Sequence, residues 1–242
     1  MFDKTRIIWG VLMALAVVVV LLIDQFLLTF ALFLGLLYLA FDEAKKLFNL
    51  KEASFLPVIL AFILGTLSYK VLIFGILALI LVLFYLAYKK AENLNLALIY
   101  IYPTLPIFAL FEVYVLWGNF ALFWLIAVVC LCDSFAYFIG KFMGKTPFCK
   151  TSPKKTLEGV VGGILCATLL GSLIGLFEYK FLFSLLCAFC VSLGAVAGDL
   201  LESYFKRMAN VKDSSSLIPG HGGVLDRIDA VMIASFVMLG LL

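Results

Sequence analysis

Charged residues are scarce in this chain, and that scarcity excludes an ordinary soluble domain. Only 14% of its 242 residues are charged, and 65% are hydrophobic. Soluble domains average about 25% charged and about 45–50% apolar residues. Nine spans of about 20 residues would use roughly 180 residues and leave only short loops. The composition predicts an all-α, polytopic membrane helix bundle that forms a single integral membrane domain over 1–242.

Repeats and low-complexity segments are also missing. The first apolar run is long enough to remain as a span, so no cleaved signal peptide is expected. Five of the six cysteines lie inside apolar runs, where cysteine acts as a small apolar side chain. Cys187 and Cys190 have CxxC spacing, but their apolar surroundings favour a structural role over metal or redox chemistry.

Nine apolar runs predict about nine transmembrane helices. Their expected ranges are 7–23, 26–40, 55–69, 71–88, 94–116, 119–139, 158–177, 181–199 and 224–242. Pro103 and Pro106 should kink or break the fifth helix, because proline removes a helical hydrogen bond and crowds the preceding turn. We expect N-terminal helices over 1–116, and catalytic helices with cytoplasmic loops over 119–242.

The basic residues indicate an orientation. If the N-terminus, with Lys4 and Arg6, is cytoplasmic, all 18 basic residues except Lys70 and Lys180 fall on the cytoplasmic side. Every polar cluster then lies on the face where anionic lipids and phosphorylated substrates are found. A transporter should place its site near the midplane. Because the middles of the spans are nearly free of charge, with Glu112 as an exception, a transporter of a phosphorylated solute is a remote alternative.

The segment 203–229 concentrates polar residues between apolar flanks and contains the only histidine, His221. Charge is costly beside hydrocarbon, so these side chains are candidates for chemistry. Asp226 and Asp229 are three residues apart and share a helix face, as oxygen ligands of Mg²⁺ can. Acids near a helix N-terminus are also stabilised by its dipole. His221 either contacts phosphate or braces the glycine-rich turn.

A second polar segment begins at Asp133, which shares a helix face with Tyr137. Because Asp133 lies in an apolar helix, it needs a partner or an ion. Two Gly-Lys pairs follow, ending at Lys141 and Lys145. Glycine permits close backbone approach and lysine supplies a cation for phosphate. A capped helix end with interfacial lysines explains these two pairs equally well.

A third segment is basic and precedes the seventh run. Ser152 is expected to cap that helix, with Pro153 at its first position. Lys154, Lys155 and Thr156 would then lie near a helix N-terminus, which attracts anions. Lysine opposes the helix dipole there, so phosphate binding is favoured over a plain basic loop.

The eighth helix carries Asp199, Glu202 and Lys206 on one face. An ion pair between Glu202 and Lys206, one turn apart, is the plain structural explanation for those two residues. Asp199 follows a stretch of small residues that suits close helix packing. A carboxylate in that position is a candidate ligand.

Together these motifs resemble a known family. The pattern Ser203-x-x-Lys206-Arg207-x4-Lys212-Asp213-x-Ser215-x-x-Ile218-Pro219-x-His221-Gly222-Gly223-Val224-x-Asp226-Arg227-Ile228-Asp229 is similar, without a gap, to the signature of phosphatidate cytidylyltransferases. The stretches SPKKTxEG, GDLxES and DxxAYxxGKxxGK also resemble that family, in its order. The resemblance covers residues 130–242 closely, whereas the N-terminal half agrees only in being a set of apolar helices.

The resemblance implies a membrane enzyme that joins CTP to phosphatidate, giving CDP-diacylglycerol and pyrophosphate. It implies a Mg²⁺ centre at Asp199, Asp226 and Asp229, shared with a monovalent cation such as K⁺, and a homodimer. We expect the site to face the cytoplasm from the inner membrane, with no nucleic-acid partner. The alternatives are a CTP-dependent polyprenol or phytol kinase, which would release CDP, and a CDP-archaeol synthase.

We assign the candidate site residues in two sets. The catalytic set joins carboxylates to cations and comprises Asp199, Lys206, Arg207, Asp226, Arg227 and Asp229. The substrate-binding set lies in the cytoplasmic segments and comprises Asp133, Tyr137, Lys141, Lys145, Ser152, Lys154, Lys155, Thr156, Glu158, Ser203, Lys212, His221, Gly222 and Gly223.

Overall fold

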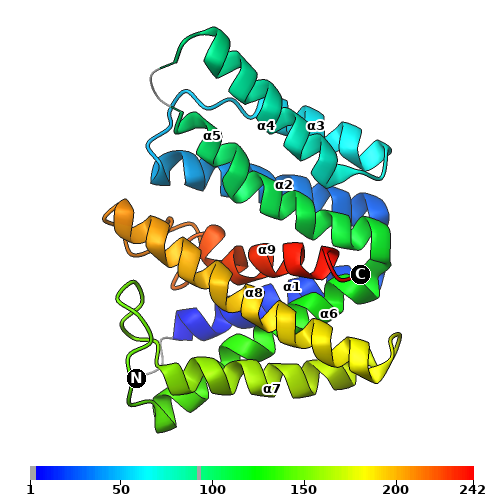
Figure 1. Cartoon of the computed structure of the whole chain (residues 1–242), viewed down its shortest axis with the longest axis vertical. Helices are drawn as coiled ribbons and strands as arrows, with labels where there is room; N and C mark the ends of the chain where they lie inside the picture. Colours follow the sequence, from blue (N-terminus) through cyan, green and yellow to red (C-terminus); the bar gives the residue numbers. More distant parts are fainter. Residues whose placement is uncertain (1–3, 92–93) are drawn as a thin grey trace. The chain divides into compact units, whose positions relative to one another are not determined.

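The computed structural model describes residues 4–91 and 94–242, with side chains from Ile8 onward (Figure 1). The helices are α1 (Lys4–Ile23), α2 (Phe26–Leu47), α3 (Leu56–Leu67), α4 (Val71–Tyr88), α5 (Leu96–Ile99), the π-helical η1 (Tyr100–Thr104), α6 (Leu105–Met143), α7 (Leu157–Gly175), α8 (Phe181–Met208) and α9 (Leu225–Leu239). Within those ranges no strand forms, and pairing is limited to two isolated bridges. The all-α prediction is confirmed.

Two backbone breaks divide the long apolar region from Leu96 to Met143. Tyr102 leaves the helical conformation, with φ −137° and ψ 120°, directly before Pro103, so the predicted proline break is confirmed. Gly118 breaks α6 with φ 78° and ψ −174°, between the fifth and sixth predicted spans. Glycine adopts a positive φ without the steric cost that a Cβ would bring.

Five helical segments are long and apolar enough to cross a membrane. They are Phe26–Leu47, Val71–Tyr88, Leu96–Met143, Leu157–Gly175 and Phe181–Met208. Ile8–Ile23 and Leu56–Leu67 are shorter apolar helices. The protein is therefore a multi-pass membrane protein. The count of nine crossings and the cytoplasmic N-terminus remain predictions, and the side chains of Lys4 and Arg6 lie outside the described residues.

The chain divides into two compact units. Unit 1 joins the described residues up to Asn119 with Ala209–Ile228, and unit 2 joins Phe120–Met208 with Asp229–Leu242. The polar segment 203–229 is thus shared between the units. Its central loop packs with the N-terminal helices, whereas both of its ends belong to unit 2.

Aromatic rings form much of the core of unit 1. The Phe111 ring lies 5.0 Å from Phe33 and 4.9 Å from Phe62, and Phe62 lies 5.3 Å from Phe108, between ring centroids. Such pairs add about 0.5–1.5 kcal/mol each beyond simple area burial. This cluster joins α2, α3 and α6.

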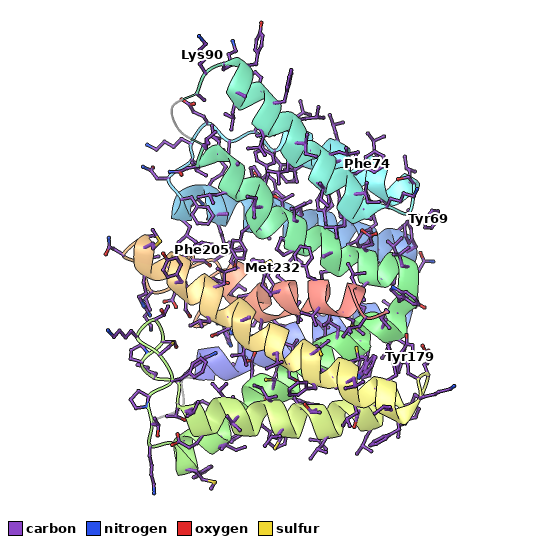
Figure 2. All side chains as sticks on the ribbon, in the orientation of Figure 1. Tyr69, Phe74, Lys90, Tyr179, Phe205 and Met232 are labelled. Atoms are coloured by element: carbon purple, nitrogen blue, oxygen red, sulfur yellow. The ribbon has the colours of Figure 1, made fainter. Side chains whose placement is uncertain are left out.

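The core of unit 2 depends on small residues and one tryptophan. The Trp124 indole N–H donates a hydrogen bond to the Gly171 carbonyl at 2.7 Å. The Trp124 ring also stacks on Tyr179 at 5.2 Å. Tyr179 lies in the turn between α7 and α8 (Figure 2). These contacts join α7 to α6 near the α7–α8 turn.

Glu112, a charged residue inside the fifth predicted span, caps another helix. Its buried carboxylate accepts a hydrogen bond from the Leu72 N–H, in the first turn of α4. The first N–H groups of a helix have no partner within that helix. Glu112 is therefore explained by structure.

Glu112→Ala is expected to lower the free energy of unfolding by about 1–3 kcal/mol, because it leaves a helix N–H without its acceptor. Glu112→Gln retains a carbonyl oxygen that can accept the same bond, so it should lose much less. Denaturant unfolding in detergent would measure both variants. An equal loss in the two variants would contradict the capping role.

Candidate functional site

The loop between α6 and α7 is held by Glu158. The Glu158 carboxylate accepts hydrogen bonds from the Lys145 N–H at 3.1 Å, the Thr146 N–H at 3.1 Å and the Thr146 hydroxyl at 2.8 Å. An antiparallel bridge between Pro147 and Thr156 closes the loop. Glu158, predicted to bind substrate, thus has a structural role: it holds the loop between α6 and α7 in place.

The residue that caps α7 is Thr156, and the prediction of Ser152 as the cap is wrong. The Thr156 hydroxyl accepts a hydrogen bond from the Gly159 N–H at 3.2 Å, and α7 begins at Leu157. The residues before it form a turn of their own, in which the Ser152 carbonyl accepts from the Lys155 N–H at 3.1 Å. Threonine is a favoured N-cap when its hydroxyl can accept a hydrogen bond from the N–H three residues later. The helix therefore starts directly after Thr156.

The glycines of the two Gly-Lys pairs give Thr156 room to approach α6. A Cβ on Gly144 would overlap the Gly140 carbonyl and the Thr156 side chain, and a Cβ on Gly140 would lie 3.0 Å from the Thr156 hydroxyl. Lys141 lies over the exposed Tyr137 ring, with Nζ 5.8 Å from its centroid. These contacts give Gly140 and Gly144 a structural role in packing.

Six charged side chains of unit 2 form what we call the charged cluster. Lys155 pairs with Asp199, and Lys206 pairs with Glu202 at 3.2 Å. Asp229 interacts electrostatically with Asp199, Lys206 and Asp133. Its members are Asp133, Lys155, Asp199, Glu202, Lys206 and Asp229. The predicted ion pair between Glu202 and Lys206 is confirmed.

The charged cluster is rich in negative charge and partly buried. Four carboxylates and two ammonium groups give it a net formal charge of −2. Glu202, Lys206 and Asp229 are buried. Buried charge requires nearby compensation, and oxygen-rich anionic sites suit a hard divalent cation. Across 4–91 and 94–242, three or more His, Cys, Asp or Glu side chains nowhere form a ready ligand set, so the Mg²⁺ site remains a prediction.

Asp199 and Asp229 approach each other because α8 and α9 pack closely at Gly198. A Cβ on Gly198 would overlap the Asp229 carbonyl and lie 3.0 Å from the Ala230 Cα. One turn earlier, a Cβ on Gly194 would lie 3.0 Å from the Ala234 Cα. The packing role predicted for the small residues before Asp199 is confirmed.

Unit 1 contains a polar cavity of about 410 Å³ in what we call the cavity loop, residues 212–227. This loop lies in the orange connection between α8 and α9 (Figure 1). Lys212, Asp213, His221 and Arg227 are among the residues that line the cavity. Two lysine or arginine cations and an imidazole in one polar hollow suit a phosphorylated ligand.

His221 lies at the inner edge of that cavity. Its N–H donates to the Ile218 carbonyl at 3.0 Å, and the Ile218 N–H donates to the Gly222 carbonyl at 2.8 Å. The His221 ring also lies against α1, because its Nε2 is 3.4 Å from where a Cβ on Gly10 would be. Its Nδ1 is buried and has no hydrogen-bond partner in the described part of the chain. The turn is therefore braced by the backbone, and the buried Nδ1 of His221 is left without a hydrogen bond.

Asp226 holds the cavity loop together. Its Oδ2 accepts hydrogen bonds from the Ser214 N–H at 2.8 Å, the Ser214 hydroxyl at 2.9 Å and the Gly223 N–H at 2.8 Å. It lies in the first turn of α9, as predicted. Asp226 and Asp229 thus have different partners, since Asp229 belongs to the charged cluster.

Glu43 is the important residue that the sequence analysis missed. It is buried near the end of α2, and its carboxylate binds the cavity loop through the Ser214 and Ser215 hydroxyls and the Val224 and Leu225 N–H groups. The second apolar run was predicted to end at residue 40, and Glu43 lies just beyond that end. Its position on a continuing helix was the signal that could have identified it.

Several predicted cations remain exposed and accessible to a ligand. This group comprises Lys141, Lys145, Lys154, Arg207, Lys212 and Arg227. Ser203 and Ser152 are half-buried. A larger cavity of about 720 Å³, beside α3 and α4, is lined mainly by apolar residues such as Leu60 and Leu77. Its lining residues include no lysine or arginine, so it does not suit a phosphate group.

The fold and these clusters define a multi-pass membrane protein whose polar groups suit phosphorylated ligands. A sequence model of the cytidylyltransferase family matches residues 4–242. The chain belongs to this family.

Relatives agree with that assignment over nearly the whole chain. A phosphatidate cytidylyltransferase of Helicobacter pylori J99 is 40% identical over 237 residues, which cover 96% of this chain and 89% of the relative. That of strain 26695 is 38% identical over 244 residues, covering 99% and 92%. That of Bacillus subtilis is 39% identical over 120 residues, covering 48% and 45%. The predicted resemblance is confirmed, and it extends beyond 130–242 into the N-terminal half.

Proposed function

We propose that this protein transfers the cytidylyl group of CTP to phosphatidate, giving CDP-diacylglycerol and pyrophosphate. The observation that carries the proposal is the 40% identity to a phosphatidate cytidylyltransferase over 96% of the chain. The multi-pass fold supports a lipid substrate whose tails stay in the bilayer. The polar cavity and the charged cluster support a phosphorylated one.

The reaction joins two polyanions, which explains why cations are needed. A phosphate oxygen of the lipid attacks the α-phosphorus of CTP, a new P–O bond forms, and the bond to the bridging oxygen of the β-phosphate breaks. Pyrophosphate leaves with that oxygen. Lysine and arginine groups neutralise and align such phosphates. Lys212, His221 and Arg227 would hold the phosphates of CTP in the polar cavity.

The charged cluster fits a divalent cation by the chemistry of its donors. Asp199 and Asp229 would hold Mg²⁺, because the partly exposed Asp199 and the buried Asp229 share a site with net negative charge. When bound, Mg²⁺ supplies charge neutralisation at phosphate oxygens. Asp226 was predicted as a third ligand, although its Oδ2 already accepts three hydrogen bonds. A K⁺ ion, the homodimer and an inner-membrane location with a cytoplasmic site complete the proposal.

The deciding experiment measures pyrophosphate release by the purified protein in detergent with CTP and Mg²⁺. Release should require phosphatidate, and label from the cytidine of CTP should move into the lipid fraction. Formation of CDP with a lipid alcohol would instead assign the protein as a CTP-dependent lipid kinase. Archaeal ether lipid in place of phosphatidate tests the CDP-archaeol variant.

A further inference from the structure

We propose that Glu43 is a positioning residue that holds the cavity loop in the conformation that binds CTP. This inference rests on the proposed function. Glu43 lies on α2, in the N-terminal half, outside every motif that carried the family resemblance. It acts through the loop.

Glu43 accepts four hydrogen bonds, all from the region of the cavity loop. Its Oε1 accepts from the Ser215 hydroxyl at 2.7 Å and the Val224 N–H at 2.9 Å. Its Oε2 accepts from the Ser214 hydroxyl at 3.0 Å and the Leu225 N–H at 2.9 Å. The side chain is 3% exposed. Hydrogen bonds to a carboxylate are about twice as strong as neutral ones.

These four donors lie at both ends of the segment that lines the polar cavity. One pair directly follows Lys212 and Asp213, and the other directly follows the turn at His221. A single carboxylate thus ties the two ends of the loop together. It also satisfies N–H groups at the start of α9, which have no partner within that helix. The cavity keeps its shape only while both ends of the loop stay bound to Glu43.

Gly223 provides independent evidence that this clamp is built into the fold. A Cβ on Gly223 would lie 2.5 Å from Glu43 Oε2 and 2.7 Å from Oε1, and would overlap the Ser214 hydroxyl. A Cβ at this position would therefore require the Glu43 carboxylate and the Ser214 hydroxyl to move out of the clamp. Gly223, predicted to bind substrate, lets Glu43 approach the backbone.

Ser214 extends the clamp to Asp226. Its single hydroxyl proton is shared between Glu43 Oε2 at 3.0 Å and Asp226 Oδ2 at 2.9 Å. Asp226 in turn accepts from the Gly223 N–H. The network therefore also fixes the first turn of α9, from which Arg227 reaches the cavity.

Glu43→Gln is the sharpest test, because glutamine has almost the same shape. Each glutamate oxygen accepts one backbone N–H, and a backbone N–H in a fixed turn cannot turn away. An amide NH₂ in either position would therefore face a donor. A residue that merely fills space would tolerate glutamine. We expect the KM for CTP to rise about tenfold or more, with faster hydrogen exchange at Val224 and Leu225.

The matched control is Asp42→Asn, one residue earlier on α2. The Asp42 side chain is 46% exposed and pairs with Lys46, one turn further along α2, at 2.6 Å. This variant should keep the wild-type KM, kcat and exchange rates. If Glu43→Gln fails to fold, Ser214→Ala keeps the test open. Ser214 does not line the cavity, and its replacement removes one hydroxyl from the clamp. This variant should raise the KM for CTP by a smaller factor than Glu43→Gln does.

Two results would overturn the proposal. One is a Glu43→Gln variant with wild-type KM for CTP and unchanged exchange in the cavity loop. The other is activity that falls only in proportion to folded protein, with the KM unchanged. A wild-type protein that transfers no cytidylyl group would refute the proposed function, whereas the exchange measurement would still decide whether Glu43 holds the loop.

Discussion

Asp229→Asn is expected to lower kcat for cytidylyl transfer by about 100-fold or more, in the range seen when one electrostatic group is removed from an active site. Asp229 is buried in the charged cluster beside Asp199. Asparagine keeps the shape and removes the negative charge that a divalent cation needs. The concentration of Mg²⁺ for half-maximal activity should rise in the same variant.

The fold should survive this substitution. The Asp229 Oδ1 accepts a hydrogen bond from the Ala230 N–H at 2.8 Å, and an asparagine oxygen can accept the same bond. Loss of one charge also relieves repulsion within an anionic cluster. The melting temperature should therefore stay within a few degrees. Asp24→Asn is the control, because Asp24 is exposed with φ 45° and asparagine tolerates that conformation. Normal turnover and Mg²⁺ dependence in Asp229→Asn would remove Asp229 from the metal site.

Local patterns in the sequence predicted most of the helices. The break at Pro103 was predicted inside the fifth apolar run, and the break at Gly118 falls between the fifth and sixth runs. Both could be predicted because backbone chemistry acts within a few residues. The α7 cap was misplaced by four residues for a related reason. Ser152 and Thr156 are both good caps locally, and the close approach of α7 to Gly144 favours the second. That approach depends on tertiary packing, which spacing alone does not show.

The sequence predicted which residues belong to the site better than it predicted which residues contact one another. The sequence places Asp226 and Asp229 on one helix face, yet Asp226 accepts bonds from the cavity loop and Asp229 joins the charged cluster. Glu43 was missed because its four partners lie 171 to 182 residues away. No spacing rule covers such a distance. The local sign in the sequence was a glutamate just beyond the end of an apolar run.

Gly198→Ala is expected to reduce activity about as strongly as loss of a catalytic group, although it adds only one methyl. That methyl would overlap the Asp229 carbonyl and press on the Ala230 Cα. Both are backbone atoms, which cannot rotate away as a side chain does. The helices α8 and α9 must therefore separate at the point where Asp199 and Asp229 meet. A displacement of about 1 Å in an active site can cost about 100-fold in rate.

Gly240→Ala provides the matched comparison, since its Cβ would have no neighbour nearer than 3.5 Å. It tests the general effect of removing a glycine near the end of unit 2 and should leave activity unchanged. Overpacking at Gly198 should lower the free energy of unfolding by about 1–3 kcal/mol. Turnover per folded molecule, measured across a Mg²⁺ titration, separates that effect from catalysis. Wild-type turnover and Mg²⁺ affinity in folded Gly198→Ala would mean that the distance between Asp199 and Asp229 does not govern the reaction.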